Sequence, residues 1–412
     1  MPDHVLDTLL AESRDLLGDI AALRHDLHRW PEIGIDNPIT RDRILAELEP
    51  LHLDVTLHRT TSGIGALLTG GLPGPTVLLR ADTDALPMPE DTGVEFASRV
   101  DGAMHACGHD THVSMLVGAA RLLAARRETL RGRVLFMFQP GEEGQGGAKY
   151  MLDEGLLDVP SAPDGTASPV AAAFALHASA AAPTGLIASR SGPLMASSDR
   201  LVITVTGRGG HASEPFRALD PIPVACEIVQ ALQTMVTRRI DVFDPSVITV
   251  ARISAGTAHN VIPETAEIEG TIRAVSERTR SRVADGIRRV AEGIAAAHEA
   301  TAEVLIDWGY PVTKNSDHMA DFAMDVARSL LGDKQVRRLP NPVMGAEDFS
   351  YVLERLPGAM MFLGATPPER NPATAPPNHS NRVQFDDESM VTGMAVHAAT
   401  ALQFLDTRPL EN

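Results

Sequence analysis

Short apolar runs alternate with helical patterns through the first 190 residues, and this alternation limits the possible folds more than any other feature. Runs of this kind, bounded by Gly, Pro or polar residues, are typical of strands buried on both faces. They occur at 76–80 (TVLLR), 133–138 (RVLFMF) and 170–176 (VAAAFAL). A helical repeat of apolar residues follows His112, between the first two runs. Because strand–helix–strand order requires a right-handed crossover, we predict an α/β fold with a mostly parallel sheet.

The middle of the chain has a different order, strand–helix–strand–strand–helix–strand. The expected strands are at 201–206, 246–253, 266–272 and 302–306, and the expected helices at 220–238 and 278–298. This order is that of the ferredoxin-like α+β fold. We therefore predict an inserted domain at 192–308, within a larger domain built from 1–191 and 309–412.

Charge and hydropathy exclude two classes of partner. The chain has 36 basic and 54 acidic residues, whereas a nucleic-acid partner needs a basic face. No run reaches the roughly 18 apolar residues of a membrane helix, and the N-terminus lacks signal-peptide character. We therefore expect a cytoplasmic protein with no nucleic-acid or membrane partner. Of the two cysteines, Cys226 lies in a helical pattern and is expected to be a buried core thiol.

Residues of metal-ligand types occur at four points near predicted strand ends, the edge at which open α/β sheets bind ligands. The first point is Asp82 and Asp84, which follow the run at 76–80 and face the same way in an extended segment. A carboxylate there can bind a metal or orient a metal-bound histidine. Aspartate is also common in turns, so this pair alone leaves both interpretations open.

The second point is HACGHDTH at 105–112, which holds three histidines, one cysteine and one aspartate. Cys107 and His109 are two apart and can reach one metal, and Gly108 allows a tight bend. A polar loop that caps the following helix would explain Asp110 or Thr111. It would not explain the cysteine and the histidines.

The third and fourth points are Glu142 with Glu143, and the remote histidines His177 and His379. Adjacent carboxylates repel each other unless a cation is near. One ligand and one general base is a useful division, because neighbouring side chains point in different directions. A solvated acidic loop is the alternative, and each histidine alone could be structural.

Together these points supply five candidate ligands: Cys107, His109, Glu143, His177 and His379. One tetrahedral zinc uses three or four protein ligands, so five ligands, one of them bridging, suit two metals better. Two metals can share a water, lower its pKa and polarise a carbonyl oxygen. We expect two divalent ions per subunit. A thiolate favours zinc, whereas carboxylates and imidazoles also accept Mn²⁺, Ni²⁺ or Co²⁺.

Several segments resemble the amidohydrolase branch of the aminoacylase/carboxypeptidase metallopeptidase superfamily. That branch includes hippurate hydrolases, N-acyl-amino-acid hydrolases and auxin-conjugate hydrolases. The matching segments are LHRWPEIG, LRADTDALP, HACGHDTH, FQPGEEGQGGA, GRGGHAS, HNVIPETAEIEGTIR and GAEDFSYVL. HACGHDTH followed by PGEEG after the next strand is highly specific. The resemblance implies a two-metal catalytic domain and an inserted lid domain that forms the dimer interface of a homodimer or homotetramer.

The resemblance also implies residue roles. The same five residues would be the metal ligands, Glu142 the base that takes a proton from the bridging water, and Asp84 a residue that steers a ligand. In the lid, His211 would stabilise the oxyanion, and Asn260 and Arg273 would hold the substrate carboxylate. His211 and Asn260 could instead be turn residues, and Arg273 a charge on a strand surface. Relatives often place such lid groups in the partner subunit's active site.

The sequence departs from the family pattern at the residue after Pro215, which is Phe216, at Asn37, and in the Ala-rich stretch after His177. These departures leave the ligand set intact and put the shape of the acyl pocket in doubt.

We predict a metal-dependent amidohydrolase that cleaves the amide bond of N-acyl amino acids or related conjugates. A dipeptidase or carboxypeptidase of the same superfamily is the near alternative. A thiol enzyme with Cys107 activated by His109 or His105 would leave Glu142 and the remote histidines unexplained. A non-catalytic binding protein is disfavoured by the intact base and ligand set.

Overall fold

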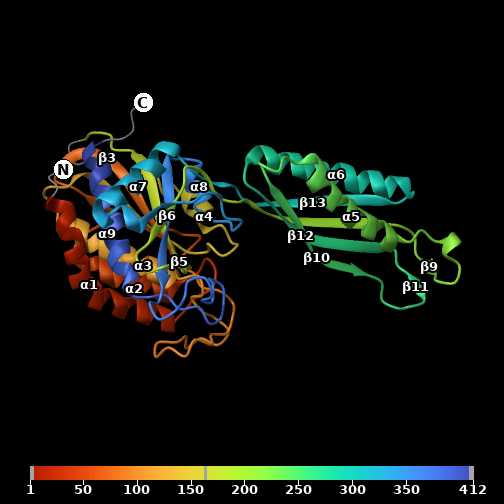
Figure 1. Cartoon of the computed structure of the whole chain (residues 1–412), viewed down its shortest axis with the longest axis horizontal. Coiled ribbons are helices and arrows are strands. Elements are labelled where there is room, and N and C mark those ends of the chain that lie inside the picture. Colours follow the sequence, from red (N-terminus) through yellow and green to blue (C-terminus); the bar gives the residue numbers. More distant parts are fainter. Residues whose placement is uncertain (1–3, 162–164, 408–412) are drawn as a thin grey trace. The chain divides into compact units, whose positions relative to one another are not determined.

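The computed structural model describes residues 4–161 and 165–407, which form two compact units (Figure 1). The first unit holds the described residues up to Leu194, then Lys314–Asn341 and the chain from Tyr351 on. The second holds Met195–Thr313 and Pro342–Ser350. These limits differ by a few residues from the expected 192 and 308. The sequence pattern gave no sign that the short segment 342–350 belongs with the second unit.

The first unit is built on an eight-stranded sheet of order β1-β2-β4-β3-β5-β16-β6-β15. Its four central strands are mutually parallel: β4 (Arg131–Gln139), β3 (Leu72–Asp82), β5 (Val170–Pro183) and β16 (Gly358–Thr366). The predicted α/β class with a mostly parallel sheet is confirmed. The outer strands are β1 (Asp54–Leu57), β2 (Ile64–Thr69), β6 (Ile187–Ser189) and β15 (Val336–Arg338). The pairs β1–β2, β2–β4 and β6–β16 are antiparallel, so antiparallel pairs flank the parallel centre of the sheet toward both of its edges.

Helices of the first unit pack against the sheet and against one another (Figure 1). Their bounds are α1 (His4–Arg29), α2 (Pro38–Leu48), α3 (His109–Ala124), α4 (Gly147–Asp153), α7 (Asp317–Leu331), α8 (Ser350–Leu353) and α9 (Ser389–Thr407). Both α3 and α9 contact β3 on one side and α1 on another. This double cover explains why both helices are buried almost all round, as helices apolar on every face usually are.

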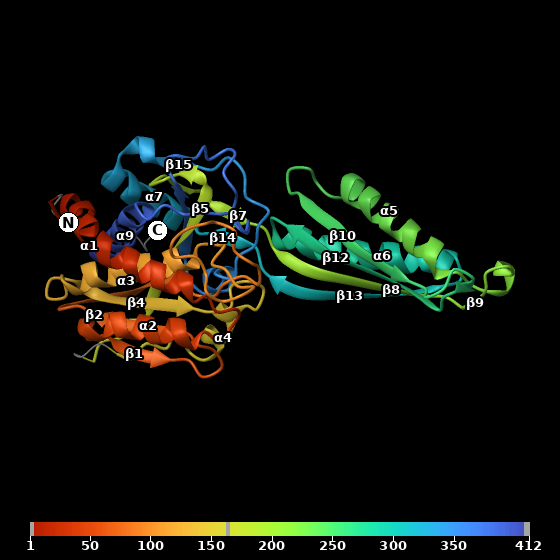
Figure 2. The same ribbon diagram turned by 90° about the horizontal axis from the view of Figure 1, so that it is seen from below.

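The second unit has the predicted ferredoxin-like order along the chain. Its elements are β8 (Ser198–Thr206), α5 (Pro221–Arg239), β10 (Ser246–Ala255), β12 (Thr265–Ala274), α6 (Glu277–Ala297) and β13 (Thr301–Tyr310). The strands pair antiparallel in the order β10-β12-β8-β13. The helices α5 and α6 lie side by side along the sheet (Figure 2). Their apolar stripes and the inward residues of the strands form a separate core, which includes Leu201, Ile268, Leu232 and Ile287.

Two small sheets complete the fold. One pairs β9 (Gly210–His211) with β11 (Val261–Ile262), and the other pairs β7 (Gly192–Met195) with β14 (Thr313–Asn315). The expectation for Cys226 was wrong, because this residue is exposed on α5. The buried stripe of that helix runs through Val224, Ala225 and Ile228, and Cys226 falls just outside it. None of the helices in the described residues has the length and apolar character of a membrane span.

Candidate functional site

The predicted ligands meet at one edge of the eight-stranded sheet. Cys107 lies in the loop before α3, His109 is the first residue of α3, and Glu143 follows β4. His379 lies in the loop between β16 and α9, where its φ of 68° is in the left-handed region. His177 was expected after a strand. It instead lies within β5, which runs on to Pro183, so a fixed backbone position aims its ring.

Cys107 is common to two groups of potential metal-ligand atoms. One group joins it to His109 and His177, and the other joins it to Glu143 and His379. Within each group the ligand atoms all lie within 4.8 Å of one another. The Sγ atom of Cys107 lies 3.4 Å from Nε2 of His177 and 3.3 Å from Nε2 of His379. The structure therefore brings all five predicted ligands together, with the sulfur between the two groups.

Two buried atoms in these groups test whether the donors fit a cation. Nε2 of His109 is buried and forms no hydrogen bond among the described residues, whereas Oε1 of Glu143 is buried and has an ion-pair contact, 3.2 Å from Nε2 of His379. Leaving such an atom unpaired costs about 1–3 kcal/mol, which a bound cation would offset. The other ring nitrogen of His109 lies 2.8 Å from the backbone oxygen of Asp84. A proton on that nitrogen leaves the lone pair of Nε2 available to a metal ion, the arrangement usual for metal-binding histidines. The donor set fits a divalent ion.

Burial shifts the pKa values of two donors, whereas, against the effect of burial, Asp82 and Cys107 raise the pKa of His109 well above its usual value. Burial, with Glu143 and Asp82 nearby, raises the pKa of the Cys107 thiol to about 12, although His109 opposes the shift. At neutral pH this thiol would lose its proton only to a strong local positive charge. Burial also keeps the pKa of His177 well below its usual value, so the ring is neutral and able to coordinate.

Asp84 connects His109 to the loop that carries Glu142 and Glu143. Its carboxylate accepts the backbone N–H of Glu142 at 2.9 Å and of Glu143 at 3.0 Å, while its backbone oxygen faces His109. Asp84 is only 1% exposed, so these bonds are shielded from water. A residue so placed fixes the loop that follows β4 relative to α3. Glu142 is also buried, and its carboxylate lies within 4.8 Å of ligand atoms of His109 and Glu143.

Sequence reasoning missed a buried network around Asp82. Nδ1 of His112 donates to Asp82 at 2.5 Å, and Nε2 of His112 accepts the N–H of Ala178 at 2.7 Å. Arg80 pairs with the other oxygen of Asp82 at 2.6 Å. His112 thus holds the backbone directly after His177. The sequence signal for this network was the two-residue spacing of Asp82 and Asp84, which fitted either a turn or a metal site.

Asn378 is a second residue that sequence reasoning missed. Its side-chain NH₂ donates to the backbone oxygens of Cys107 at 3.2 Å and Ala178 at 2.9 Å, and its oxygen accepts the N–H of Ala180 at 3.0 Å. The N–H of His379 donates to Ala106 at 2.9 Å. These bonds fix the loop that carries His379 and support its left-handed backbone. Only its position next to a candidate ligand could have marked Asn378 in the sequence.

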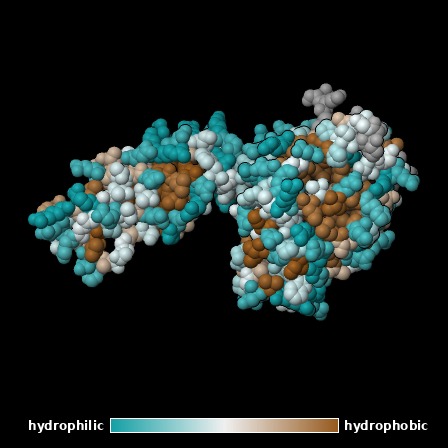
Figure 3. Space-filling view, turned by 180° about the vertical axis from the view of Figure 1, so that it is seen from behind, coloured by the Kyte–Doolittle hydropathy of each residue, from teal (hydrophilic) through white to brown (hydrophobic). Residues whose placement is uncertain are grey.

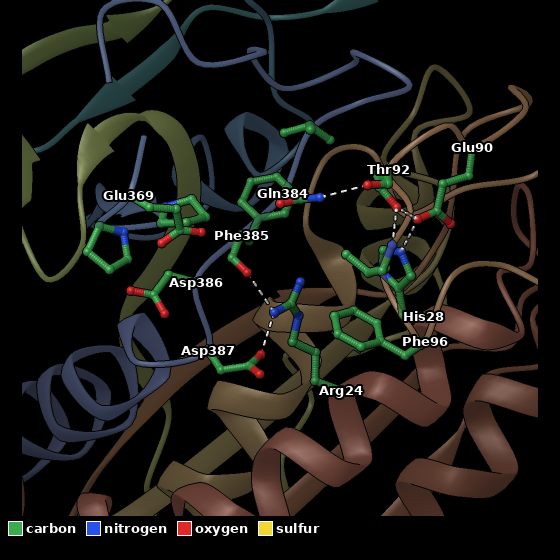
Figure 4. Close-up of a pocket in the computed structure, with 14 residues that line it drawn as sticks. Arg24, His28, Glu90, Thr92, Phe96, Glu369, Gln384, Phe385, Asp386 and Asp387 are labelled. Atoms are coloured by element: carbon green, nitrogen blue, oxygen red, sulfur yellow. Dashed lines mark hydrogen bonds and ion pairs between the residues drawn. The ribbon is translucent and has the colours of Figure 1, made fainter. Parts of the chain in front are cut away.

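A buried ionic network holds Asp110 in the first turn of α3, and Figure 4 shows its partners Arg24 and His28. Asp110 accepts from Nε of Arg24 at 3.1 Å and pairs with Nδ1 of His28 at 2.9 Å, and Arg24 also donates to the backbone oxygen of Phe385 at 2.9 Å. Arg24 and His28 line a cavity of about 340 Å³. Burial opposes protonation, but Asp110 and Glu90 raise the pKa of His28 to about 9. The network anchors the turn that begins with His109.

Replacing Arg24 with methionine is expected to destabilise the protein by about 3–5 kcal/mol, because Asp110 would lose its main partner while remaining buried. Chemical denaturation followed by circular dichroism measures the change. Arg14→Met is the matched control, since Arg14 also lies on α1 but pairs with Glu388 at an exposed site. Exposed pairs contribute at most about 1 kcal/mol. Equal effects of the two substitutions would contradict a stabilising role for the buried network.

The remaining predicted residues lie in the second unit. His211 is exposed on β9, where its Nδ1 faces the Ser213 hydroxyl at 2.7 Å. Asn260 directly precedes β11, and its backbone oxygen accepts the N–H of Ala212 at 3.1 Å, so the structure brings Asn260 and His211 together. Arg273 lies at the far end of β12 and donates to the backbone oxygen of Met344 at 3.1 Å. Within this unit the structure does not bring Arg273 to the other two.

A mixed α/β sheet whose edge gathers a cysteine, imidazoles and carboxylates is typical of the class of metal-dependent hydrolases. A family model described as peptidase family M20/M25/M40 matches residues 78–403, and the chain belongs to this family. The chain is 37% identical to an N-acetylcysteine deacetylase of Bacillus subtilis, covering 93% of this chain and 96% of the relative. It is 36% identical to thermostable carboxypeptidase 1 of Saccharolobus solfataricus, covering 97% and 99%.

Two further relatives extend the comparison. A hippurate hydrolase of Campylobacter jejuni is 33% identical, with 96% of this chain and 99% of the relative covered. The crystal structure of a dinuclear metal-binding peptidase of the M20 family from Bacillus subtilis superposes with a TM-score of 0.81. It is 34% identical and covers 96% of this chain and 99% of that one. The predicted superfamily and the predicted hydrolase of C–N bonds are confirmed.

Proposed function

We propose that this protein hydrolyses the amide bond of N-acyl amino acids, with two divalent ions held around Cys107 and Glu142 as the general base. The observation that carries the proposal is the convergence of four donor residues on the buried sulfur of a fifth, Cys107, next to the carboxylate of Glu142. The names of the relatives support the substrate class, since they include a deacetylase of N-acetylcysteine and a hippurate hydrolase.

In this proposal two groups of residues would hold the ions, His109 and His177 with Cys107 in one group, and Glu143 and His379 with Cys107 in the other. When bound, the two ions supply Lewis-acid activation of a water and of the scissile carbonyl.

The protein's own contribution to the reaction is proton transfer and orientation. Glu142 takes the proton from the attacking water and gives it to the nitrogen of the leaving amino acid. Asp84 keeps Glu142 in position through the backbone N–H that its carboxylate accepts at 2.9 Å. His211 stabilises the oxyanion, and Asn260 and Arg273 bind the substrate carboxylate.

A dipeptidase or carboxypeptidase is the second candidate, favoured by the carboxypeptidase relative. The two candidates share chemistry, because a peptide with a free carboxyl end is itself an acylated amino acid. A panel of N-acetyl, N-benzoyl and indole-acyl amino acids beside dipeptides separates them. We expect kcat/KM at least tenfold higher for the N-acyl amino acids. The reverse order would favour the peptidase.

Chelation tests the metal requirement. We expect a chelator to abolish turnover and added Zn²⁺, Mn²⁺ or Co²⁺ to restore it, and the ion that restores most activity would identify the preferred metal. Turnover that resists chelators but is lost on alkylation would favour a thiol enzyme.

We also propose that the reaction takes place in the cytoplasm. The two unpaired cysteines and the proposed thiolate ligand suit a reducing compartment.

We further propose that the working form is a homodimer or a larger assembly joined through the second unit. Strand β10 is an edge of its sheet and exposes apolar side chains, including 43% of Val247 and 48% of Ile253. Figure 3 shows hydrophobic residues gathered on part of the visible face of this unit. An exposed apolar edge strand readily pairs with another chain. A second copy would also explain why Arg273 lies apart from Asn260.

The substitution Ile253→Lys is expected to convert the assembly to a monomer, since a charge on an edge strand opposes edge-to-edge pairing. Light scattering coupled to size exclusion would then report the chain mass of 44.0 kDa. Leu305→Lys is the matched control, because Leu305 is 56% exposed on β13, at the opposite edge of the sheet. A wild-type protein that is already monomeric would rule out this assembly.

A further inference from the structure

The second unit contains a cavity of about 420 Å³ that is lined mainly by arginines. It lies between the C-terminal end of α5 and the first half of α6. The lining residues are Met235, Arg239, Ile240, Arg278, Ser281, Arg282, Asp285 and Arg289. Four arginines therefore face one carboxylate, in a chain whose formal net charge is −18. The local charge is opposite in sign to that of the whole protein.

The arginines reach the cavity from two helices. Arg278, Arg282 and Arg289 are four and seven residues apart along α6, a spacing that places them on one face. Arg239 belongs to the last turn of α5. Like charges four residues apart destabilise a helix slightly, so nothing in the packing of α6 requires this stripe.

Three of these guanidinium groups form no ion pair with a carboxylate, although Asp285 lines the same cavity. Arg278 pairs with Asp244 at 2.8 Å. Asp285 lies 3.6 Å from Arg288, a residue that does not line the cavity. Among the described residues, Arg239, Arg282 and Arg289 form no ion pair or side-chain hydrogen bond.

Several other arginines of the same unit are paired with carboxylates. Arg200 pairs with Glu269, and Arg280 with Asp199 at 2.6 Å. The cavity is distinguished because three arginines without an ion pair line one hollow together.

The floor of the cavity is apolar. Met235 and Ile240 are 6% and 8% exposed and belong to or adjoin the core between the helices and the sheet. Ser281 adds a hydroxyl at the wall. The cavity thus combines apolar surface with several guanidinium donors, and its volume lies in the range of small-molecule sites.

We propose that this cavity binds a small organic phosphate, with the phosphate between the arginines and an apolar group on Met235 and Ile240. Guanidinium groups bind phosphate oxygens through paired N–H donors. Three unpaired guanidinium groups match the charge and the three free oxygens of a phosphate monoester better than a single carboxylate. The net negative charge of the protein disfavours a long polyanion, which would extend beyond the cavity. The site is separate from the residues proposed for amide hydrolysis.

Calorimetric titration of the full-length protein at constant ionic strength tests the proposal, with phenyl phosphate, inorganic phosphate and benzoate as probes. We expect phenyl phosphate to bind at least tenfold more tightly than benzoate, and inorganic phosphate to bind between them. The double substitution Arg282→Gln/Arg289→Gln should weaken phenyl phosphate binding by at least tenfold. Circular dichroism checks that this exposed pair of changes leaves the fold intact.

Arg238→Gln is the matched control, because Arg238 is exposed at the end of α5 next to Arg239 but does not line the cavity. This variant should bind phenyl phosphate as the wild type does. Equal binding by the double variant and the wild type would overturn the proposal, because the phosphate would then lie elsewhere. Equal weakening in Arg238→Gln would also overturn it, since it would indicate general attraction to positive charge. Failure of phenyl phosphate to bind the wild type would overturn it directly.

Discussion

Replacing Glu142 with glutamine is expected to lower kcat by about 10²- to 10⁴-fold, the usual contribution of a general base, while the metal content stays unchanged. Glutamine has the shape of glutamate but cannot take a proton from water. The backbone N–H of residue 142 would still donate to Asp84, so the loop should keep its position. Steady-state kinetics and elemental analysis of the purified variant measure both quantities.

Glu143→Gln is the matched control, since it alters the neighbouring carboxylate in the same loop. Oε1 of Glu143 lies 3.2 Å from Nε2 of His379 and is proposed to bind metal. This variant should lose metal as well as activity. A fully active Glu142→Gln protein would show that the base is another residue. Loss of metal from Glu142→Gln would show that Glu142 is a ligand.

Replacing Cys107 with alanine is expected to reduce the bound metal from two ions to fewer than one and to abolish turnover. The reason is that its sulfur belongs to both ligand groups, 3.4 Å from His177 and 3.3 Å from His379. Removing one end ligand should be less severe, so His379→Ala should retain part of the metal. Elemental analysis after gel filtration in metal-free buffer gives the stoichiometry.

Cys226→Ala controls for the loss of a thiol, because Cys226 is the other cysteine and is exposed on α5. It should keep its metal and its activity. A thiol enzyme would also lose activity on replacement of Cys107, so activity alone does not separate the two mechanisms. Metal content does, because a Cys107→Ala protein that kept two ions would contradict the place of Cys107 in both ligand groups.

The sequence predicted strands β3, β4 and β5 and the residues that converge at the edge of their sheet. Strands β3 and β4 are largely buried and therefore read as continuous apolar runs, and the grouping of ligand-type residues beside strand ends favoured one site over separate turns, loops and structural histidines. The outer strands escaped prediction because β6 and β15 are three residues long and β1 is exposed throughout. Such short or exposed strands depend on their neighbours for pairing and carry little periodic signal.

Other features of the site could not be read from the chain because they depend on side chains meeting across the fold. Spacing alone could not show that Asp82 holds His112, or that Asn378 joins two loops that are distant in sequence. The helical pattern that placed Cys226 in a core did not show that the buried stripe of α5 runs through Val224, Ala225 and Ile228 and leaves Cys226 outside it. The far end of β12 likewise carries Arg273 away from Asn260, although both came from one matching segment.

The division of the chain into two units has a consequence for how this protein could change over time. The proposed metal ligands and the proposed base Glu142 belong to the first unit, whereas His211, Asn260 and Arg273, which are proposed to bind the oxyanion and the substrate carboxylate, belong to the inserted second unit. Each unit has its own core, so substitutions in one need not disturb the stability of the other. Selection could therefore alter which conjugates are accepted while the bond-breaking apparatus is inherited intact.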